Sequence, residues 1–224
     1  MSNNIELIIF DWDGTLMDSQ QRILECLKSA ANDCDANLHS DETFCDIIGL
    51  GLKEATEALY PEFSAQQVND YSDRYRYHYL VQNETHSPLF SGAEQTLQNL
   101  KDSGYWLAVA TGKGRQGLDL VLEKTQLGSF FLSTRCASET YSKPHPLMLE
   151  EIMHELGIEP DQTLMIGDTE YDMQLAQNAG THYLAVSYGV HSIDRLLKYK
   201  PLGHIDHITE LPIWLKSNQT KSKQ

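Results

Sequence analysis

The fold of this chain is decided by the stretch Ile5-Glu6-Leu7-Ile8-Ile9-Phe10-Asp11-Trp12-Asp13-Gly14. Its first six residues form a mostly apolar run that predicts a buried strand, and two aspartates follow closely. Side chains alternate along a strand, so Asp11 and Asp13 are expected on the same face, with Gly14 allowing a sharp turn beyond them. Two carboxylates are therefore expected at a strand's carboxyl end, where open α/β sheets bind their ligands.

Carboxylates as close as those of Asp11 and Asp13 repel one another unless a cation or a shared proton offsets their charge. The pair therefore indicates a metal site or acid–base chemistry. An acidic turn without chemistry is the alternative, because aspartate and glycine are ordinary turn residues. The pair alone leaves both interpretations open.

The rest of the chain divides into a helical segment and an alternating one. Helical spacing dominates from about residue 17 to residue 88, with no convincing strand. After Pro88, strands alternate with helices, which is typical of parallel strands covered on both faces. These later strands are expected at 106–110, 130–137, 164–166 and 182–187.

This pattern predicts an α/β fold with a doubly wound, mainly parallel sheet and an inserted helical domain. We expect residues 1–16 and 89–224 to form the α/β core, and residues 17–88 to form the helical insert. The polar segment 217–224 is expected to fray.

Composition limits the classes of protein to which the chain can belong. With 224 residues, 41% hydrophobic and 22% charged, it is expected to bury a sizeable core. No apolar stretch reaches the ~18–20 residues of a membrane span and no secretory leader is recognisable, so we expect a soluble cytoplasmic protein. The net charge of −15 argues against nucleic acids and anionic membranes as partners. The four cysteines lack CxxC spacing and are expected to be reduced.

The segment Asp11-Trp12-Asp13-Gly14-Thr15-Leu16-Met17-Asp18-Ser19 resembles the nucleophile motif of the haloacid dehalogenase (HAD) superfamily of phosphotransferases. In that family the first aspartate attacks phosphorus and the second is the general acid and base. The resemblance therefore implies these roles for Asp11 and Asp13. Trp12 is a departure, since many relatives carry leucine or methionine there, but it is expected to face away from the carboxylates.

Two further segments resemble the second and third motifs of that family. Thr111 follows a strand, where the family places a hydroxyl that binds the phosphoryl group, and Gly112 brings a backbone N–H group to a helix start. A simple helix N-cap is the alternative for Thr111. Lys143, directly before Pro144, matches the lysine that offsets negative charge at the site, and a solvated lysine is its alternative.

The segment Gly167-Asp168-Thr169-Glu170-Tyr171-Asp172 resembles the fourth motif. The resemblance implies that Mg²⁺ is the cofactor, held by Asp168, Asp11 and the backbone carbonyl of Asp13. Asp172 is expected to reach the metal through water or to hold Lys143. Its alternative is a favourable position in the dipole of the next helix.

One pattern points to a different ligand. Gly112, Gly114 and Gly117 satisfy the GxGxxG pattern of dinucleotide-binding proteins, after a strand and before a helix. That pattern normally opens the first βαβ unit, whereas here it follows the second core strand. A nicotinamide or flavin site is therefore not favoured.

The resemblance extends from residue 5 to about residue 190 and covers a Rossmann-like HAD core with a C1-type cap. It is strongest to the phosphoglycolate phosphatase-like branch. It implies Mg²⁺-dependent hydrolysis of a small-molecule phosphate monoester through an aspartyl-phosphate on Asp11. Gly51 and Lys53 lie in a segment that resembles the specificity loop of such caps, although Lys53 could instead be solvated.

Several alternatives remain open at this point. A β-phosphoglucomutase-like mutase, a pyrophosphatase and a phosphonatase that uses Lys53 as a Schiff-base amine share the core motifs, and a catalytically silent binding module is the non-enzymatic alternative. The tyrosines at 71, 75 and 79 share a helical face, which favours packing of the cap over stacking on a base. We expect a monomer or a homodimer.

Overall fold

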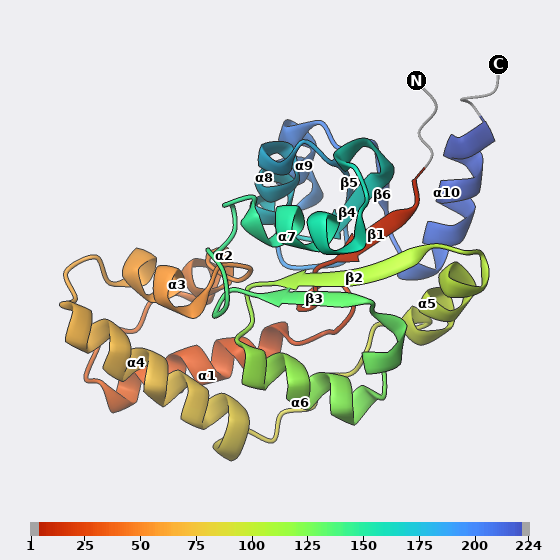
Figure 1. The fold of residues 1–224 in the computed structure, drawn as a ribbon. Helices are drawn as coiled ribbons and strands as arrows, with labels where there is room; N and C mark the ends of the chain where they lie inside the picture. Colours follow the sequence, from red (N-terminus) through yellow and green to blue (C-terminus); the bar gives the residue numbers. More distant parts are fainter. Residues whose placement is uncertain (1–4, 221–224) are drawn as a thin grey trace.

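The computed structural model describes residues 5–220, and a six-stranded sheet runs through the centre of this part of the chain (Figure 1). The strand order is β3-β2-β1-β4-β5-β6, and every neighbouring pair is parallel. The bounds are β1 Leu7–Phe10, β2 Trp106–Thr111, β3 Ser133–Cys136, β4 Thr163–Gly167, β5 His182–Val186 and β6 His204–Ile205. The predicted doubly wound α/β fold is confirmed, with β6 as an edge strand that the sequence analysis did not predict.

Helices cover both faces of this sheet and extend beyond one end of it (Figure 1). The first group is α1 Gln20–Asp33, α2 Asp41–Asp46, α3 Leu52–Leu59, α4 Ala65–Tyr77 and the π-helix η1 His78–Gln82. The second group is α5 Ala93–Asp102, α6 Arg115–Thr125, α7 Leu147–Leu156, α8 Glu170–Ala179, α9 Ile193–Leu196 and α10 Leu211–Thr220. Short 3₁₀ turns occupy Gly128–Phe130, Pro160–Gln162, Leu197–Tyr199 and Ile208–Glu210.

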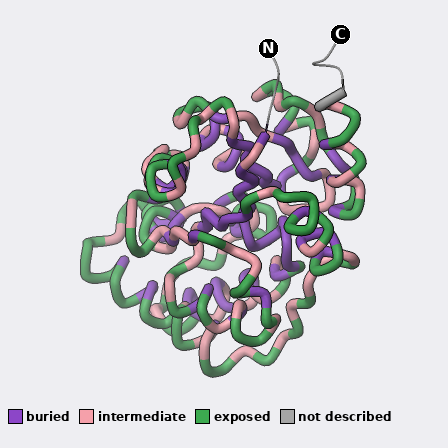
Figure 2. Tube along the Cα trace, turned by 45° about the vertical axis from the view of Figure 1, so that its right-hand side comes forward, coloured by how far each residue is buried: buried purple, intermediate pink, exposed green. Residues whose placement is uncertain are grey.

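The central strand β1 is buried on both sides, which explains why its sequence is apolar almost without interruption. Ile8 and Phe10 belong to the apolar cluster under α5, α6 and α10, whereas Leu7 and Ile9 belong to the cluster under α7 and α8. The buried trace in Figure 2 follows the central strands, and the exposed positions gather on the outer helices and loops. The first strand therefore joins two apolar layers.

The helices α1 to α4 and the π-helix η1 lie together beside the ends of β1 and β2 (Figure 1). They enclose an apolar cluster of their own, in which Tyr71 is fully buried and donates a hydrogen bond to the Leu27 carbonyl at 2.8 Å. The segment that leaves the sheet for these helices lies beside the segment that returns from them, and the Asp18 N–H donates a hydrogen bond to the Pro88 carbonyl at 2.8 Å. Two antiparallel connections therefore link this helical group to the sheet.

The C-terminal segment differs in part from the prediction. Residues 217–220 were expected to fray, but they belong to α10. Leu211 and Leu215 hold this helix against the sheet, and both are buried in the apolar cluster beside α5. Residues 221–224 lie outside the described residues.

Two further predictions concern cysteines and membranes. All four cysteines are free thiols, as their spacing predicted. Within the described residues, none of the helices is both long enough and apolar enough to cross a membrane.

We expect Ile8→Ala to lower the free energy of unfolding by about 2–5 kcal/mol, because it leaves a cavity at the centre of the sheet. Urea unfolding followed by tryptophan fluorescence measures this loss. Ile213→Ala is the matched control, since Ile213 is 72% exposed, and its effect should stay within about 0.5 kcal/mol. Equal effects of the two substitutions would contradict the placement of Ile8 in the core.

Candidate active site

Three aspartates converge at the carboxyl end of the central strands. Asp11 follows β1, Asp168 follows β4 and Asp172 lies in the first turn of α8. The strands β1 and β4 are adjacent and parallel, and Phe10 pairs with Ile166, so Asp11 and Asp168 emerge at the same edge of the sheet. One carboxylate oxygen from each of the three lies within 4.8 Å of the others, and all three residues are buried.

The turn after β1 explains how Asp11 and Asp13 are presented. The strand ends at Phe10, so strand alternation does not place these aspartates as predicted. Gly14 has a φ of +80°, and a Cβ on it would lie 2.2 Å from an Asp168 carboxylate oxygen. Glycine is therefore required here both for the left-handed backbone and for the close approach of Asp168.

Lys143 lies among the carboxylates and is fully buried. Its Nζ is 2.8 Å from Asp11 Oδ1 and 2.6 Å from Asp172 Oδ1. Burial alone would lower the pKa of Lys143, but attraction to the two carboxylates outweighs burial and raises it. Asp172 also accepts hydrogen bonds from the N–H and hydroxyl groups of Thr169, so it both caps α8 and holds Lys143.

One ammonium does not neutralise this cluster. Burial raises the pKa of Asp11 to about 7 despite the opposing attraction of Lys143. The pKa of Asp168 is raised well above its ordinary value, first by burial and then by the charges of Asp11 and Asp172. Although Asp11 Oδ1 contacts the Lys143 ammonium, no described donor points at it with hydrogen-bonding geometry.

These features fit a hard divalent cation such as Mg²⁺, which takes oxygen ligands. A cation beside Asp11 and Asp168 would offset the charge that raises their pKa values. The ordering of Asp168 is consistent with this, because it accepts hydrogen bonds from the Thr15 hydroxyl at 2.9 Å and from the Val190 N–H at 2.8 Å. Two donors of the protein itself therefore hold this carboxylate in place.

The second carboxylate of the N-terminal motif, Asp13, is held separately from this cluster. The Ser19 hydroxyl donates to its Oδ1 at 2.6 Å, and the Lys113 ammonium lies 2.9 Å from its Oδ2. Ser19 ends the N-terminal motif quoted from the sequence, but no role was predicted for it or for Lys113. Its position two residues after Thr111, in a turn that ends at a strand edge, was the signal that could have identified it.

Thr111 and Gly112 lie at the carboxyl end of β2 and border the same cavity as Asp11 and Asp13. Thr111 is the last residue of β2 and is buried, and its Oγ1 accepts a hydrogen bond from the Lys113 N–H at 3.2 Å. The helix α6 begins at Arg115 with Gly114 as its N-cap, so Thr111 does not have the alternative role of a cap. Gly112 touches the loop after α2, because a Cβ on it would lie 2.5 Å from the carbonyl oxygens of Gly49 and Leu50.

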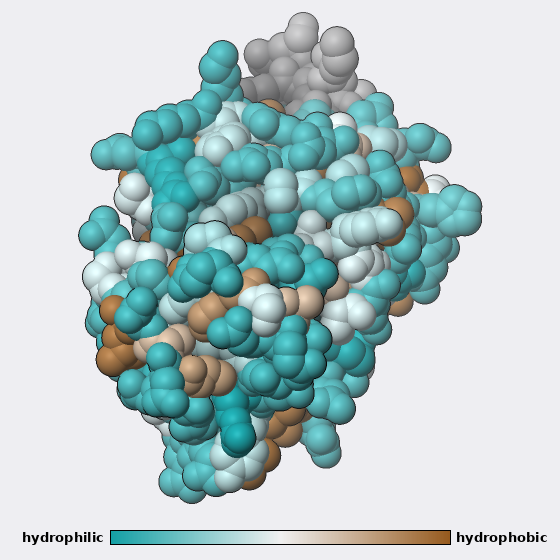
Figure 3. All heavy atoms as spheres, turned by 90° about the vertical axis from the view of Figure 1, so that its left-hand side faces the viewer, coloured by the Kyte–Doolittle hydropathy of each residue, from teal (hydrophilic) through white to brown (hydrophobic). Residues whose placement is uncertain are grey.

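These residues border a cavity of about 770 Å³ between the strand ends and the helical group. Asp11, Asp13, Thr111 and Gly112 form part of its polar side. The helical group contributes apolar and aromatic side chains to the lining, namely Ile23, Leu27, Ile47, Ile48, Leu50, Tyr75, Tyr79 and Leu80. Charged side chains, among them Lys53, Glu54, Arg76, Lys113 and Arg115, also border the cavity. The face of the molecule in Figure 3 is mostly hydrophilic, with only small apolar areas.

Of the two residues in the segment that resembles a specificity loop, only Gly51 contacts the surroundings of Lys143. The Gly51 N–H donates to the Ser142 hydroxyl at 2.7 Å, next to Lys143. Lys53 borders the cavity, but its side chain is 68% exposed and its Nζ lies 3.8 Å from Glu57. Asp11, Asp168, Asp172 and Lys143 thus form one cluster, and Asp13, Thr111 and Gly112 border the same cavity as Asp11. Gly51 is buried beside Ser142, whereas Lys53 lies exposed at the border of the cavity.

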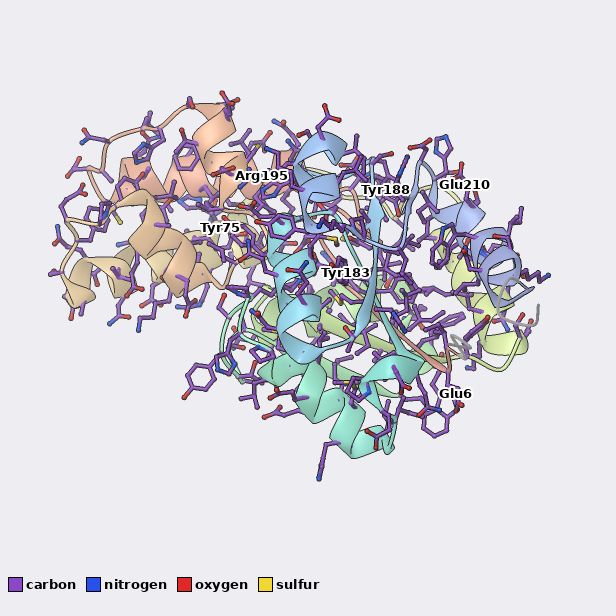
Figure 4. All side chains as sticks on the ribbon, turned by 90° about the horizontal axis from the view of Figure 1, so that it is seen from above. Glu6, Tyr75, Tyr183, Tyr188, Arg195 and Glu210 are labelled. Atoms are coloured by element: carbon purple, nitrogen blue, oxygen red, sulfur yellow. The ribbon has the colours of Figure 1, made fainter. Side chains whose placement is uncertain are left out.

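Further contacts hold the helical group against the core. Arg195 of α9 forms ion pairs with Asp46 at the end of α2 and with Glu170 of α8, and Figure 4 shows it between these elements. The Tyr171 hydroxyl also donates to the Asp46 carbonyl at 2.8 Å. The cavity is therefore bounded by two groups of elements that are in direct contact.

Known proteins resemble this chain over nearly its whole length. The pyrophosphatase PpaX of Anoxybacillus flavithermus is 28% identical over 209 residues, which cover 93% of this chain and 95% of that protein. The probable phosphatase IndB of Dickeya dadantii is 32% identical over 211 residues, covering 92% and 91%.

A solved structure and a family model complete the comparison. The crystal structure of a predicted phosphoglycolate phosphatase from Haemophilus somnus superposes with a TM-score of 0.85 at 24% identity, covering 95% of this chain and 98% of that one, and it shows the same fold. The family model described as haloacid dehalogenase-like hydrolase matches residues 8–186, from β1 to the end of β5. The chain therefore belongs to the haloacid dehalogenase-like hydrolase family, as its motifs predicted.

Proposed function

We propose that this enzyme is a Mg²⁺-dependent phosphatase that hydrolyses a small-molecule phosphate monoester through an aspartyl-phosphate on Asp11. The phosphatase class is supported by the family and by the names of the relatives. The observation that carries the finer proposal is the burial of Asp11 beside Lys143 and Asp168, at the polar side of a cavity that can hold an organic group.

In the first half-reaction, a carboxylate oxygen of Asp11 forms a bond to phosphorus while the bond from phosphorus to the ester oxygen breaks. The electron pair of that bond leaves on the ester oxygen, and Asp13 supplies the proton that makes it an alcohol. In the second half-reaction, water attacks phosphorus and Asp13 takes its proton. The bond to Asp11 then breaks, which releases inorganic phosphate and restores the carboxylate.

Other residues stabilise the charge on the phosphoryl oxygens. Lys143 supplies a buried positive charge beside Asp11, and Thr111 and Gly112 offer a hydroxyl and a backbone N–H group. Asp11, Asp168 and the backbone carbonyl of Asp13 would hold Mg²⁺, which supplies further positive charge to the phosphoryl group. Asp172 keeps Lys143 in position.

We also propose that residues 17–88 act as a cap on a core made of residues 1–16 and 89–224. The paired connections near Asp18 and Pro88 support this division, because all of α1 to α4 and η1 lies between them. The cap would exclude water from the phosphoryl group, and its loop near Gly51 and Lys53 would contact the rest of the substrate.

Pyrophosphate is a second candidate substrate, because several relatives are named pyrophosphatase PpaX. The apolar and aromatic side chains that the cap contributes to the cavity favour an organic ester instead. The two candidates differ in the leaving group and share the nucleophile, so one set of assays distinguishes them.

We expect phosphate release from a panel of organic monoesters and pyrophosphate to require Asp11. Asp11→Asn should reduce kcat by at least about 1,000-fold, because the amide cannot form the acyl-phosphate bond. Asp102→Asn, at an exposed position, is the matched control. Full activity of Asp11→Asn would refute the assignment of Asp11 as the nucleophile. Faster turnover of pyrophosphate than of any organic ester would identify pyrophosphate as the preferred substrate.

We expect the stability of the metal-free protein to fall as the pH rises between about 4 and 7. Burial raises the pKa of Asp11 from 3.8 to about 7, so in this range the folded protein retains a proton that the unfolded chain has lost. Above this range the ionised carboxylate destabilises the fold, by up to about 4 kcal/mol. Chemical unfolding of EDTA-treated protein across the range measures this effect.

The control for that experiment is Asp11→Asn, which has no carboxylate to titrate. The difference in unfolding free energy between the two proteins should therefore change with pH, and an identical pH profile would contradict the raised pKa. Adding Mg²⁺ above this pH range should raise the Tm of the wild type and have little effect on Asp168→Asn. Equal Tm shifts in both proteins would argue against a site at Asp168.

We expect Gly112→Ala to reduce kcat/KM by roughly tenfold or more, because its Cβ would meet the backbone of the cap loop and prevent full closure. Gly114→Ala is the matched control, since a Cβ there meets nothing closer than the Ser138 hydroxyl at 4.0 Å. Steady-state kinetics of both variants, with Tm as a check on folding, make the comparison. Equal activities would show that the contact at Gly112 is not needed.

A further inference from the structure

The mechanism above leaves one buried cation without a role. Lys113 lies in the turn between β2 and α6, and its side chain is only 6% exposed. Its Nζ lies 2.9 Å from Asp13 Oδ2, while the Ser19 hydroxyl occupies Asp13 Oδ1. Each oxygen of this carboxylate therefore faces one donor, and the two donors come from different elements of the fold.

The same ammonium also contacts the cap. It donates a hydrogen bond to the Tyr79 hydroxyl at 2.9 Å and lies 4.3 Å from the centre of the Tyr79 ring. Tyr79 belongs to the π-helix η1 and stacks on Tyr75, with the ring centres 5.8 Å apart. Single π-helical turns within helical segments are frequent at functional sites. Lys113 is thus a direct link between Asp13 and the cap.

The surrounding chain makes room for this link. A Cβ on Gly117, in the first turn of α6, would lie 3.0 Å from Cγ of Lys113 and 3.3 Å from its Cδ. Glycine at this position therefore lets the lysine stem pass over the helix. A buried ammonium is costly without partners, and here Asp13 and Tyr79 supply them.

We propose that Lys113 is a positioning residue, which aims the Asp13 carboxylate at the ester oxygen and makes this aim depend on cap closure through Tyr79. The inference rests on the proposed function, because it assigns Asp13 the transfer of a proton to the leaving oxygen. Without Lys113, Asp11 could still form its bond to phosphorus. It would impair the protonation of the leaving oxygen when the bond from phosphorus to that oxygen breaks.

The test compares two esters of similar size, phenyl phosphate and 4-nitrophenyl phosphate. Phenolate is the more basic leaving group, so its departure depends more on a proton from Asp13. Lys113→Met should therefore reduce kcat/KM for phenyl phosphate roughly tenfold more than for 4-nitrophenyl phosphate. Lys124→Met, at an exposed lysine of α6, should leave both values unchanged. An equal loss on both esters would overturn the proposal.

Two further variants show whether Lys113 acts through its partners. In an Asp13→Asn background, Lys113→Met should cause little additional loss, because residues that act as one unit are not additive. Tyr79→Phe keeps the ring and removes the hydroxyl, so it should give a smaller loss that again falls mainly on phenyl phosphate. If the losses caused by Lys113→Met and Asp13→Asn simply added, Lys113 would not act through Asp13. If Tyr79→Phe had the same kinetics as the wild type on both esters, the proposed link to the cap would be wrong.

Gly117→Ala tests the same proposal in case Lys113→Met does not fold. It displaces the lysine stem, retains the ammonium and should reproduce the selective loss on phenyl phosphate. A Gly117→Ala variant with wild-type kinetics on both esters would count against the proposal. If the wild type released phosphate from neither ester nor any other monoester, the proposed function would fall together with this inference. Turnover that requires Asp11 but shows no selective loss would overturn the inference alone.

Discussion

The arrangement of this molecule depends on keeping several carboxylates together away from water. Asp11, Asp168 and Asp172 lie within 4.8 Å of one another, and their mutual repulsion adds to the cost of burial. Lys143 offsets part of this charge, and the adjacent parallel strands β1 and β4 supply the rigid frame that holds the groups in place. A fold with strand ends at one edge is suited to this task, because residues distant in the sequence meet there without long loops.

The molecule as a whole is strongly negative, and this charge repels an anionic substrate. The chain carries a net charge of −15, yet the proposed phosphate site holds two buried ammonium groups, those of Lys143 and Lys113. Burial strengthens their local effect, since water and salt do not screen them well. The site can therefore attract a phosphate group within a strongly acidic protein.

Much of the sheet and the meeting of Asp11 with Asp168 could be predicted from the sequence, because strand ends and short motifs are local properties. Asp11 and Asp168 each follow an apolar run, and parallel strands bring their ends together. The role of Lys113 could not be predicted in this way, because it depends on Tyr79, which is 34 residues earlier and belongs to a different group of helices. The helical end of the chain at 217–220 was also missed, since its local sequence is polar and its anchoring by Leu211 and Leu215 is tertiary.

The glycines that follow β2 and open α6 show how one sequence pattern can have two physical origins. In dinucleotide-binding proteins such glycines let the backbone approach a pyrophosphate. In this chain Gly112 accommodates the carbonyl groups of a facing loop, and Gly117 accommodates an aliphatic stem. The spacing GxGxxG thus arises where two parts of one polypeptide meet. Searches for cofactor-binding proteins that rely on this pattern alone would place such a chain in the wrong class, and its strand position is what separates the two cases.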